Sequence, residues 1–151
     1  MDLKFIPITT NEDEMKPYLS NAFCLEVFET FKEFYANVPF QWPWVGFFAL
    51  LKDEVVGVGG YKGGPINNKV EIGYGVTPEN ERKGYATKIC KHLVTFALQQ
   101  DPKITVTART LMKENPSTSI LKKNGFSYVG IVNDPDDGHV WEWEYHNLFR
   151  E

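Results

Sequence analysis

The stretch VEIGYGVTPENERKGYATKICKHLVTFALQQ, residues 70–100, decides the fold of this chain of 151 residues. Its first seven residues alternate between two faces, which is the period of a half-buried strand. The apolar face carries Val70, Ile72, Tyr74 and Val76, and the other face carries Glu71, Gly73 and Gly75. After a turn that contains Pro78 and Asn80, apolar residues recur at helical spacing and form one stripe that can face a sheet. The stretch therefore predicts a strand, a turn and a helix in close succession.

The segment between this strand and this helix is suited to bind phosphate. Gly84 and the small residues after it let main-chain N–H groups approach a ligand closely. The first N–H groups of a helix have no partner within the helix and carry partial positive charge. Arg82, Lys83 and Lys88 add cationic charge nearby. We therefore predict that the main chain of residues 83–87 forms a cradle for a diphosphate.

The same segment resembles the acyl-CoA-binding motif of the GNAT superfamily of N-acetyltransferases, in which R/Q-x-x-G-x-G/A opens a helix after a strand. Gly84-Tyr85-Ala86 matches the end of the motif, whereas Glu81 stands where Arg or Gln is usual. A second stretch, NPSTSILKKNGF at residues 115–126, resembles a later segment of the family, especially in the branch of ribosomal-protein N-terminal acetyltransferases and their small relatives. Two motifs in this order, about 30 residues apart, are more specific than either alone. The resemblance covers roughly residues 45–145.

Composition excludes several classes of protein. A net charge of −4 argues against a nucleic-acid-binding protein, which usually carries a basic patch. No apolar run approaches the ~20 residues that span a bilayer, and no signal peptide opens the chain, so we expect a cytoplasmic protein without a membrane partner. Cys24 and Cys90 lie on apolar helical faces and are expected to be buried free thiols. The three histidines show no metal-ligand spacing, so no metal is expected.

The rest of the chain predicts one domain, residues 1–151, around the central unit. Further strands are expected at residues 3–8, 45–51, 54–61, 103–109, 126–132 and 139–146, and further helices at 21–37 and 115–124, with a short helical turn within 11–19. Strands and helices in this order predict an α/β sandwich of the GNAT type, with a mixed, twisted sheet of six to seven strands and helices on both faces. The oligomeric state is left open, with a homodimer among the alternatives.

Two loops are candidates for the wall of an acceptor site. Residues 38–44, VPFQWPW, combine aromatic side chains with two prolines that prevent regular structure. They form either a packed cover of the sheet or part of an acceptor site. Residues 133–139 join the last two strands, and His139 and Glu142 near them are weaker candidates for the same site.

The resemblance implies where acetyl-CoA binds. In the family, the strands that correspond to residues 70–76 and 103–109 splay apart, and the pantetheine lies in the gap and pairs with the main chain of the first strand. The implied contacts with acetyl-CoA are Gly75, Val76, Thr77, Arg82, Lys83, Gly84, Tyr85, Ala86, Thr87, Asn115 and Ser117. Asn115 is the best-matched residue of the second motif, and the alternative role for it is a helix cap.

Acyl transfer from a thioester to an amine needs a deprotonated amine, a stabilised oxyanion and a proton for the departing thiolate. Glu71 is the candidate base, because the glycines beside it leave room for a substrate; the alternative is that it faces water on a half-exposed strand. A main-chain amide near Val76 would hold the oxyanion. Many family members have a tyrosine as the acid, but Leu121 occupies that position here. Ser119 matches a serine of the ribosomal-protein branch and is the candidate acid, with a plain polar surface residue as the alternative.

The sequence therefore predicts an acetyl-CoA-dependent N-acetyltransferase that acts by direct transfer on a primary amine, either a small molecule or a peptide N-terminus. One rival hypothesis is a non-catalytic module that binds or senses acyl-CoA, in which the cradle is kept and the base and acid are missing. Another is a protein-interaction domain that does not bind CoA.

Overall fold

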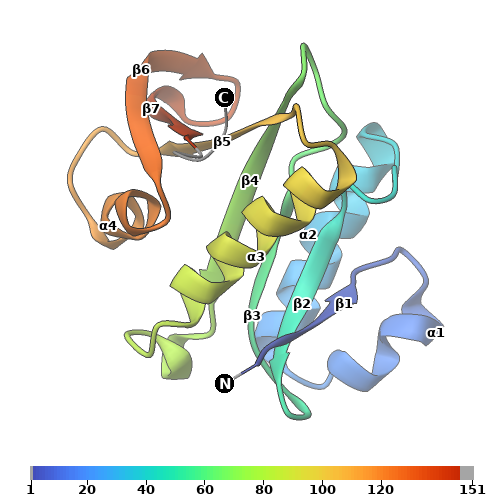
Figure 1. The fold of residues 1–151 in the computed structure, drawn as a ribbon. Helices are drawn as coiled ribbons and strands as arrows, with labels where there is room; N and C mark the ends of the chain where they lie inside the picture. The colour runs from blue at the N-terminus through green and yellow to red at the C-terminus, as the bar shows by residue number, and fades with distance from the viewer. Residues whose placement is uncertain (1, 147–151) are drawn as a thin grey trace.

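A computed structural model describes residues 2–146 of the chain, and these form one mixed sheet flanked by helices (Figure 1). The strands are β1 Lys4–Pro7, β2 Gly46–Leu51, β3 Glu54–Tyr61, β4 Lys69–Val76, β5 Thr105–Thr110, β6 Phe126–Asp134 and β7 Gly138–Tyr145. The α-helices are α1 Glu12–Met15, α2 Ala22–Asn37, α3 Tyr85–Gln100 and α4 Pro116–Lys123, with 3₁₀ turns at Lys16–Tyr18 and Pro78–Asn80. The strand order is β1-β2-β3-β4-β5-β7-β6.

The sheet opens between β4 and β5. These two strands are parallel, and they pair only along Lys69 to Ile72 of β4, opposite Thr105 to Ala108 of β5. Beyond Ile72 the two strands separate, whereas β4 stays paired with β3 as far as Val76. The expected splay is therefore present, and the second half of β4 has no neighbouring strand on that side.

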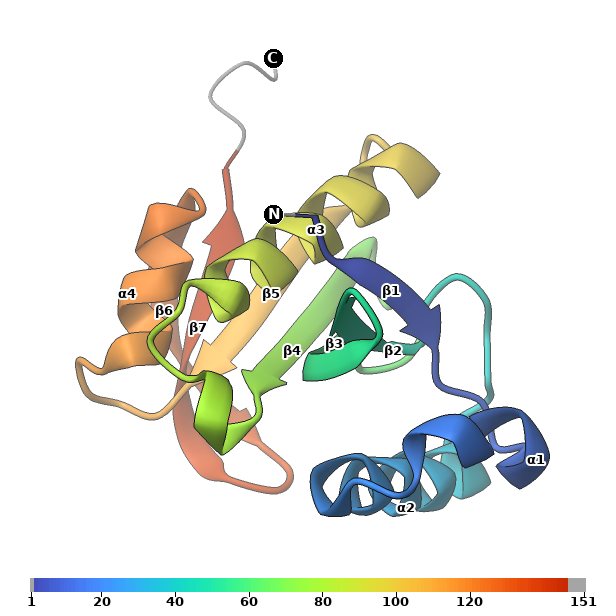
Figure 2. The same ribbon diagram turned by 90° about the horizontal axis from the view of Figure 1, so that it is seen from below.

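The helices cover the two faces of the sheet unequally (Figure 2). Helices α3 and α4 lie on one face, where α3 buries the predicted apolar stripe in the larger core cluster. Helices α1 and α2 lie on the other face, and a smaller cluster around Phe28 and Phe48 fills the space between them and the sheet. Asn21 caps α2 by accepting hydrogen bonds from the N–H groups of Phe23 and Cys24 at 2.8 and 3.4 Å.

The predicted elements are confirmed in type and order, with small differences in their ends. The fifth strand begins at Thr105 rather than 103, because Asp101 ends α3 in a turn that accepts the N–H groups of Ile104 and Lys103. The sixth strand continues to Asp134, where it pairs with Gly138 across the final turn.

Both cysteines are buried and free, as predicted. Burial raises the pKa of the Cys24 thiol to about 11 and that of the Cys90 thiol to about 12, so neither is a reactive thiolate at neutral pH. Within residues 2–146, no helix has the length and apolar character needed to cross a membrane.

Candidate active site

The predicted diphosphate cradle lies at the start of α3. Gly84 is the N-cap residue, and its φ of 84° is a left-handed conformation that glycine adopts at little cost. No side chain caps this end, and the first helical hydrogen bond joins the Lys88 N–H to the Gly84 oxygen at 3.3 Å. Among the described residues, none accepts a hydrogen bond from the amides of Tyr85, Ala86 or Thr87. Three N–H groups at the positive end of the helix are therefore available to an anion.

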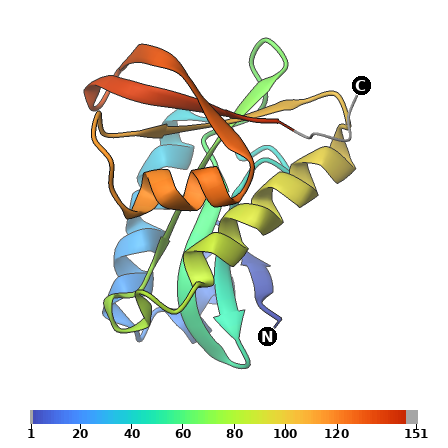
Figure 3. The ribbon, with the colours of Figure 1, turned by 60° about the vertical axis from the view of Figure 1, so that its left-hand side comes forward.

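The side chains around the cradle differ in direction. The Tyr85 side chain is buried in the core, so its main chain alone is at the cradle. Arg82 and Lys88 have exposed side chains beside Gly84, and Arg82 has a positive φ of 63°. The cradle thus combines main-chain donors with exposed cationic charge. Helix α4 runs beside the first turns of α3, where Asn124 Nδ2 donates to the Thr87 oxygen at 3.3 Å (Figure 3).

A buried asparagine, which sequence reasoning assigned only to a turn, fixes the loop before α3. Asn80 Nδ2 donates to Thr77 Oγ1 at 2.6 Å, and Asn80 Oδ1 accepts from Lys83 Nζ at 3.3 Å. Thr77 is fully buried, and its N–H and hydroxyl both donate to the Val56 oxygen, at 3.0 and 3.4 Å. These bonds tie the loop to β3 and hold the cradle in place. No pattern in the sequence distinguishes Asn80 from an ordinary turn residue.

The main chain of β4 alternates in direction between its two neighbours. The Lys62 N–H donates to the Glu71 oxygen at 2.9 Å, and the Thr77 N–H donates to the Val56 oxygen at 3.0 Å. Both bonds join β4 and its extension to the β3 side of the sheet. Because alternate residues of a strand direct their N–H and C=O groups to opposite sides, every odd-numbered residue between them also faces β3.

The even-numbered residues Tyr74 and Val76 therefore direct their main-chain groups into the gap that β5 has left. Of the three residues expected to pair with pantetheine, Val76 faces this gap, whereas Gly75 and Thr77 turn their main chain toward β3. The sequence shows which side chains share a face, but it does not show the direction of the main-chain hydrogen bonds. For that reason sequence reasoning did not include Tyr74 among the residues whose main chain faces the gap.

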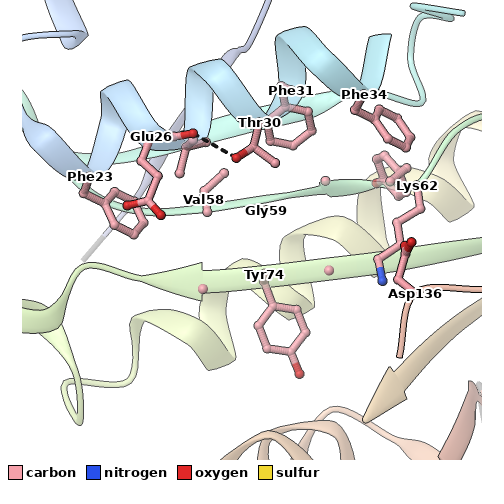
Figure 4. A pocket seen from close by; sticks show the side chains of 15 residues that line it. Phe23, Glu26, Thr30, Phe31, Phe34, Val58, Gly59, Lys62, Tyr74 and Asp136 are labelled. Atoms are coloured by element: carbon pink, nitrogen blue, oxygen red, sulfur yellow. Dashed lines mark hydrogen bonds between the residues drawn. The ribbon is translucent and has the colours of Figure 1, made fainter. Parts of the chain in front are cut away.

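A cavity of about 530 Å³ lies beneath α2, on the face of β4 that is turned away from α3 (Figure 4). Its size falls within the range of small-molecule sites. Helix α2 lines it with the apolar side chains of Phe23, Val27, Phe31 and Phe34. Strands β3 and β4 form the other side, and a Cβ atom at Gly75 would meet no atom within 4 Å. The open space expected beside the glycines of β4 is therefore present at Gly75 but not at Gly73, which Lys62 covers.

Glu71 lies on this face of β4 but is held by two cations. Its Oε2 is 2.7 Å from Lys62 Nζ, its Oε1 is 3.6 Å from Arg109 Nε, and its side chain is 17% exposed. The close contact with Lys62 is an ion pair without hydrogen-bond alignment, so the buried Oε2 has no hydrogen-bond donor. Lys62 extends over Gly73, 3.5 Å from where a Cβ would stand, and lines the cavity there. The Glu71 carboxylate is thus mostly shielded from water, and Lys62 lies between it and the cavity.

Arg109 is the centre of a charge network that sequence reasoning did not identify. Its Nη1 donates to Asp134 Oδ2 at 2.9 Å, and its Nε donates to Glu142 Oε1 at 3.4 Å. The hydrogen bond from Arg109 is the main cause that lowers the pKa of Asp134, and the Asp136 amide adds to the effect. The sequence signal for this network was weak: one charged side chain, Arg109, lies on the same face of the fifth strand as two threonines. The network anchors the turn between β6 and β7 above the site.

The second motif, residues 115–126, contains helix α4 with a capped N-terminus. Asn115 Oδ1 accepts the N–H of Thr118 at 3.0 Å, and Thr118 Oγ1 accepts the N–H of Asn115 at 3.0 Å, so Asn115 begins α4 in a capping box. Asn115 and Ser117 also line a second, polar cavity of about 260 Å³ together with Arg109. Ser119 is exposed and lies outside the cavities described.

The two candidate loops have different roles. In the loop of residues 38–44, Trp44 is buried against Tyr61, whereas Phe40 and Trp42 are exposed. None of that loop lines the cavity under α2. In the loop of residues 133–139, by contrast, Asp136 lines the cavity.

The weaker candidates His139 and Glu142 do not line the cavity under α2. His139 and His146 are exposed, and His92 stacks on Phe5 at a centroid distance of 3.7 Å at the far side of α3. Burial lowers the pKa of His92. Within the described part of the chain, no three His, Cys, Asp or Glu side chains are grouped as they would be around a metal ion.

Comparison with known families gives an extended match. A family model described as an acetyltransferase (GNAT) domain matches residues 2–127. No curated protein sequence matches the chain.

Comparison with solved structures shows the same fold at low sequence identity. A spermidine N-acetyltransferase SpeG chimera from Vibrio cholerae and hSSAT is 12% identical, with a TM-score of 0.69 over 96% of this chain and 95% of that one. The aminoglycoside acetyltransferase AAC(6')-Ib in complex with ribostamycin and coenzyme A is 16% identical, with a TM-score of 0.70 over 100% of this chain and 99% of that one. RimL, a ribosomal L7/L12 α-N-protein acetyltransferase in complex with coenzyme A, is 12% identical, with a TM-score of 0.67 over 94% and 92%.

Proposed function

The chain belongs to the GNAT acetyltransferase family, and from that premise we propose that it transfers an acetyl group directly from acetyl-CoA to a primary amine. One observation carries the proposal. The gap beside the second half of β4 and the cavity under α2 both adjoin Gly73, Tyr74 and Gly75, and the uncapped start of α3 follows this strand after residues 77–84. A donor and an acceptor can therefore meet across this strand.

On the donor side, we propose that the diphosphate of acetyl-CoA binds the amides of Tyr85, Ala86 and Thr87. This proposal is supported by the absence of a side-chain cap at the start of α3. Charge from Arg82, Lys83 and Lys88 favours the same anion. The pantetheine then lies in the gap between β4 and β5 and pairs with the main chain of Tyr74 and Val76. Asn115 and Ser117 are proposed to contact acetyl-CoA from the start of α4, where Asn115 Nδ2 has no partner among the described residues.

The chemistry follows from this placement. The amine nitrogen attacks the thioester carbonyl, the new C–N bond replaces the C–S bond, and the proton lost by the amine balances the one gained by the CoA thiolate. We propose that the Val76 amide, which faces the gap, stabilises the oxyanion. A thiol has a pKa of about 8.5, so its thiolate leaves without obligatory help. Ser119, exposed on α4, is the proposed but dispensable proton donor.

For the base, we propose that Glu71 takes the proton of the amine through a chain of water molecules along the cavity, because Lys62 separates its carboxylate from the open space beside Gly75, four residues further along β4. Replacing Glu71 by Gln should lower kcat/KM by about 10²-fold, the usual scale for a general base. The loss should be largest below neutral pH, where the amine is most fully protonated. Turnover that is unchanged in Glu71→Gln would remove Glu71 from this role.

The acceptor class is supported by the names of the structural neighbours, which are described as acetyltransferases of spermidine, of aminoglycosides and of a ribosomal protein N-terminus. All three groups of acceptors are amines. The acceptor here is therefore proposed as a primary amine.

The proposal is tested by measuring CoA thiol release from acetyl-CoA over a panel of primary amines. We expect amine-dependent release, and we expect CoA at 100 times its dissociation constant to stabilise the fold by about 2.7 kcal/mol. CoA binding without turnover on any amine would instead support an acyl-CoA sensor. No thermal stabilisation by CoA would contradict both functions.

A further inference from the structure

The cavity under α2 has two unlike ends, and the first end is acidic. In Figure 4, the Glu26 side chain extends from α2 toward the sheet near Phe23 and Val58. Val58 pairs with Gly75, so Glu26 lies over the end of β4 where the sheet has opened. An acceptor nitrogen must reach this same end to meet a thioester in the gap.

The charges of the cavity are not equally available to a ligand. Lys62 is paired with Glu71 at 2.7 Å, and Arg109, beside the cavity, is shared among three carboxylates. Glu26 has no ion-pair partner among the described residues. The unpaired charge at the reacting end is therefore negative, which favours a cationic amine and disfavours an acceptor with its own carboxylate.

The second end is aromatic, and the Asp136 carboxylate lies beside Lys62 at its edge (Figure 4). Phe31 and Phe34 line the cavity from α2 toward the Lys62 end, and their rings lie 6.4 Å apart in an edge-to-face arrangement. Phe23 and Val27 extend the same apolar surface toward Glu26. Aromatic rings contribute most to binding when a flat apolar group packs against them. A small polar amine would leave this surface uncovered.

On the basis of the proposed amine acetyltransferase function, we propose that the acceptor is a primary amine carried by a flat apolar body without a carboxylate. Glu26 binds its ammonium group, and the phenylalanine face of α2 holds its body. The ammonium loses its proton before attack, so Glu26 acts in binding and orientation, and the group transfer itself is balanced as described above.

The experiment compares five acceptors with the full-length protein and acetyl-CoA. The probes are 2-phenylethylamine, ethanolamine, spermidine, phenylalanine and phenylalaninamide. We expect 2-phenylethylamine to have the highest kcat/KM, and phenylalaninamide to exceed phenylalanine by at least about tenfold, because those two differ chiefly in the carboxylate. If spermidine or ethanolamine is the best acceptor, or if phenylalanine equals its amide, this inference is overturned while the amine acetyltransferase function stands.

Glu26→Gln and Glu29→Gln form a matched pair, since both carboxylates are exposed on α2 and only Glu26 lines the cavity under α2. Glu26→Gln should raise KM for 2-phenylethylamine about tenfold with little change in kcat, and Glu29→Gln should change neither. Equal effects in the two variants would contradict the role of Glu26. Calorimetric binding to the CoA-bound protein makes the same comparison without turnover. The inference predicts that 2-phenylethylamine binds more tightly than ethanolamine, and that Glu26→Gln weakens this binding whereas Glu29→Gln does not. Any other order of affinities contradicts it.

Discussion

The two sides of the second half of β4 present different kinds of chemical group to a ligand. On the α3 side, the groups available to a ligand belong to the main chain: the amides at the start of α3 and those of Tyr74 and Val76 in the open gap. On the α2 side, the space is bounded by side chains, with Glu26 at one end and Phe34 toward the other. A main-chain site is set by backbone conformation and tolerates many side chains, whereas a side-chain site changes with every substitution. The first is therefore suited to a constant donor and the second to a particular acceptor.

The largest effect is expected from a substitution that fills the cavity under α2, the proposed acceptor side, and leaves the donor side unchanged. Gly75→Leu places a side chain in a space where a Cβ meets nothing within 4 Å, while the Gly75 main chain stays bound to β3. We expect turnover to fall at least about 10²-fold, because the amine can no longer reach attack distance. CoA affinity should stay unchanged in calorimetry, with Gly75→Ala giving a smaller loss. A parallel loss of CoA affinity would mean that the two faces are not separable.

The donor side is tested by Gly84→Ala. Alanine at a φ of 84° is strained, and its Cβ narrows the approach to the cradle, so CoA affinity should fall roughly tenfold. Gly138→Ala is the matched control, because it also has a positive φ, 71°, and open space around its Cβ. Both variants should lose a similar free energy of unfolding, and only Gly84→Ala should bind CoA more weakly. Equal CoA affinities would show that the cradle is not the diphosphate site.

A smaller effect is expected from Glu81→Gln, which restores a residue usual in the resembled motif. Removing this exposed carboxylate beside the cradle should tighten CoA binding about two- to threefold at low ionic strength. The gain should shrink in high salt, as for any exposed charge, and titrations at two salt concentrations would measure it. Weaker binding in the variant would show that Glu81 contributes a favourable contact.

The smallest effect concerns a region that belongs to neither face of the site. Burial lowers the pKa of His92 in the fold, so the unfolded chain binds more protons as the pH falls through about 6.5. The free energy of unfolding should therefore decrease between pH 7.5 and 5.5, and His92→Phe should reduce that decrease while keeping the stack on Phe5. Denaturant titrations at both pH values test this. A change in the pH dependence of turnover would contradict the separation of His92 from the site.

Sequence reasoning reached the main-chain side of this comparison more fully than the side-chain side. The change from strand to helical period and the position of Gly84 are local signals, so the cradle and the order of elements could be predicted. Asn115 was left between a cap and a ligand contact, and its hydrogen bond to Thr118 shows the cap.

The proposed acceptor side could not be predicted because its parts are distant in sequence. Glu26 looks like one of several carboxylates on an amphipathic helix, and only the packing of α2 against the sheet brings it to the same cavity as Gly75. Glu71 was identified from its glycine neighbours, but its ion pairs come from Lys62 on another segment and Arg109 on β5. Local periodicity carries no information about such contacts.

The central claim, that donor and acceptor meet across the second half of β4, is tested most directly by a crystal structure with acetyl-CoA. The account predicts diphosphate oxygens at hydrogen-bond distance from the amides of Tyr85, Ala86 and Thr87, pantetheine paired with Tyr74 and Val76, and the acetyl group at the floor of the cavity under α2. A diphosphate bound elsewhere, or an acetyl group with no access to that cavity, would contradict it.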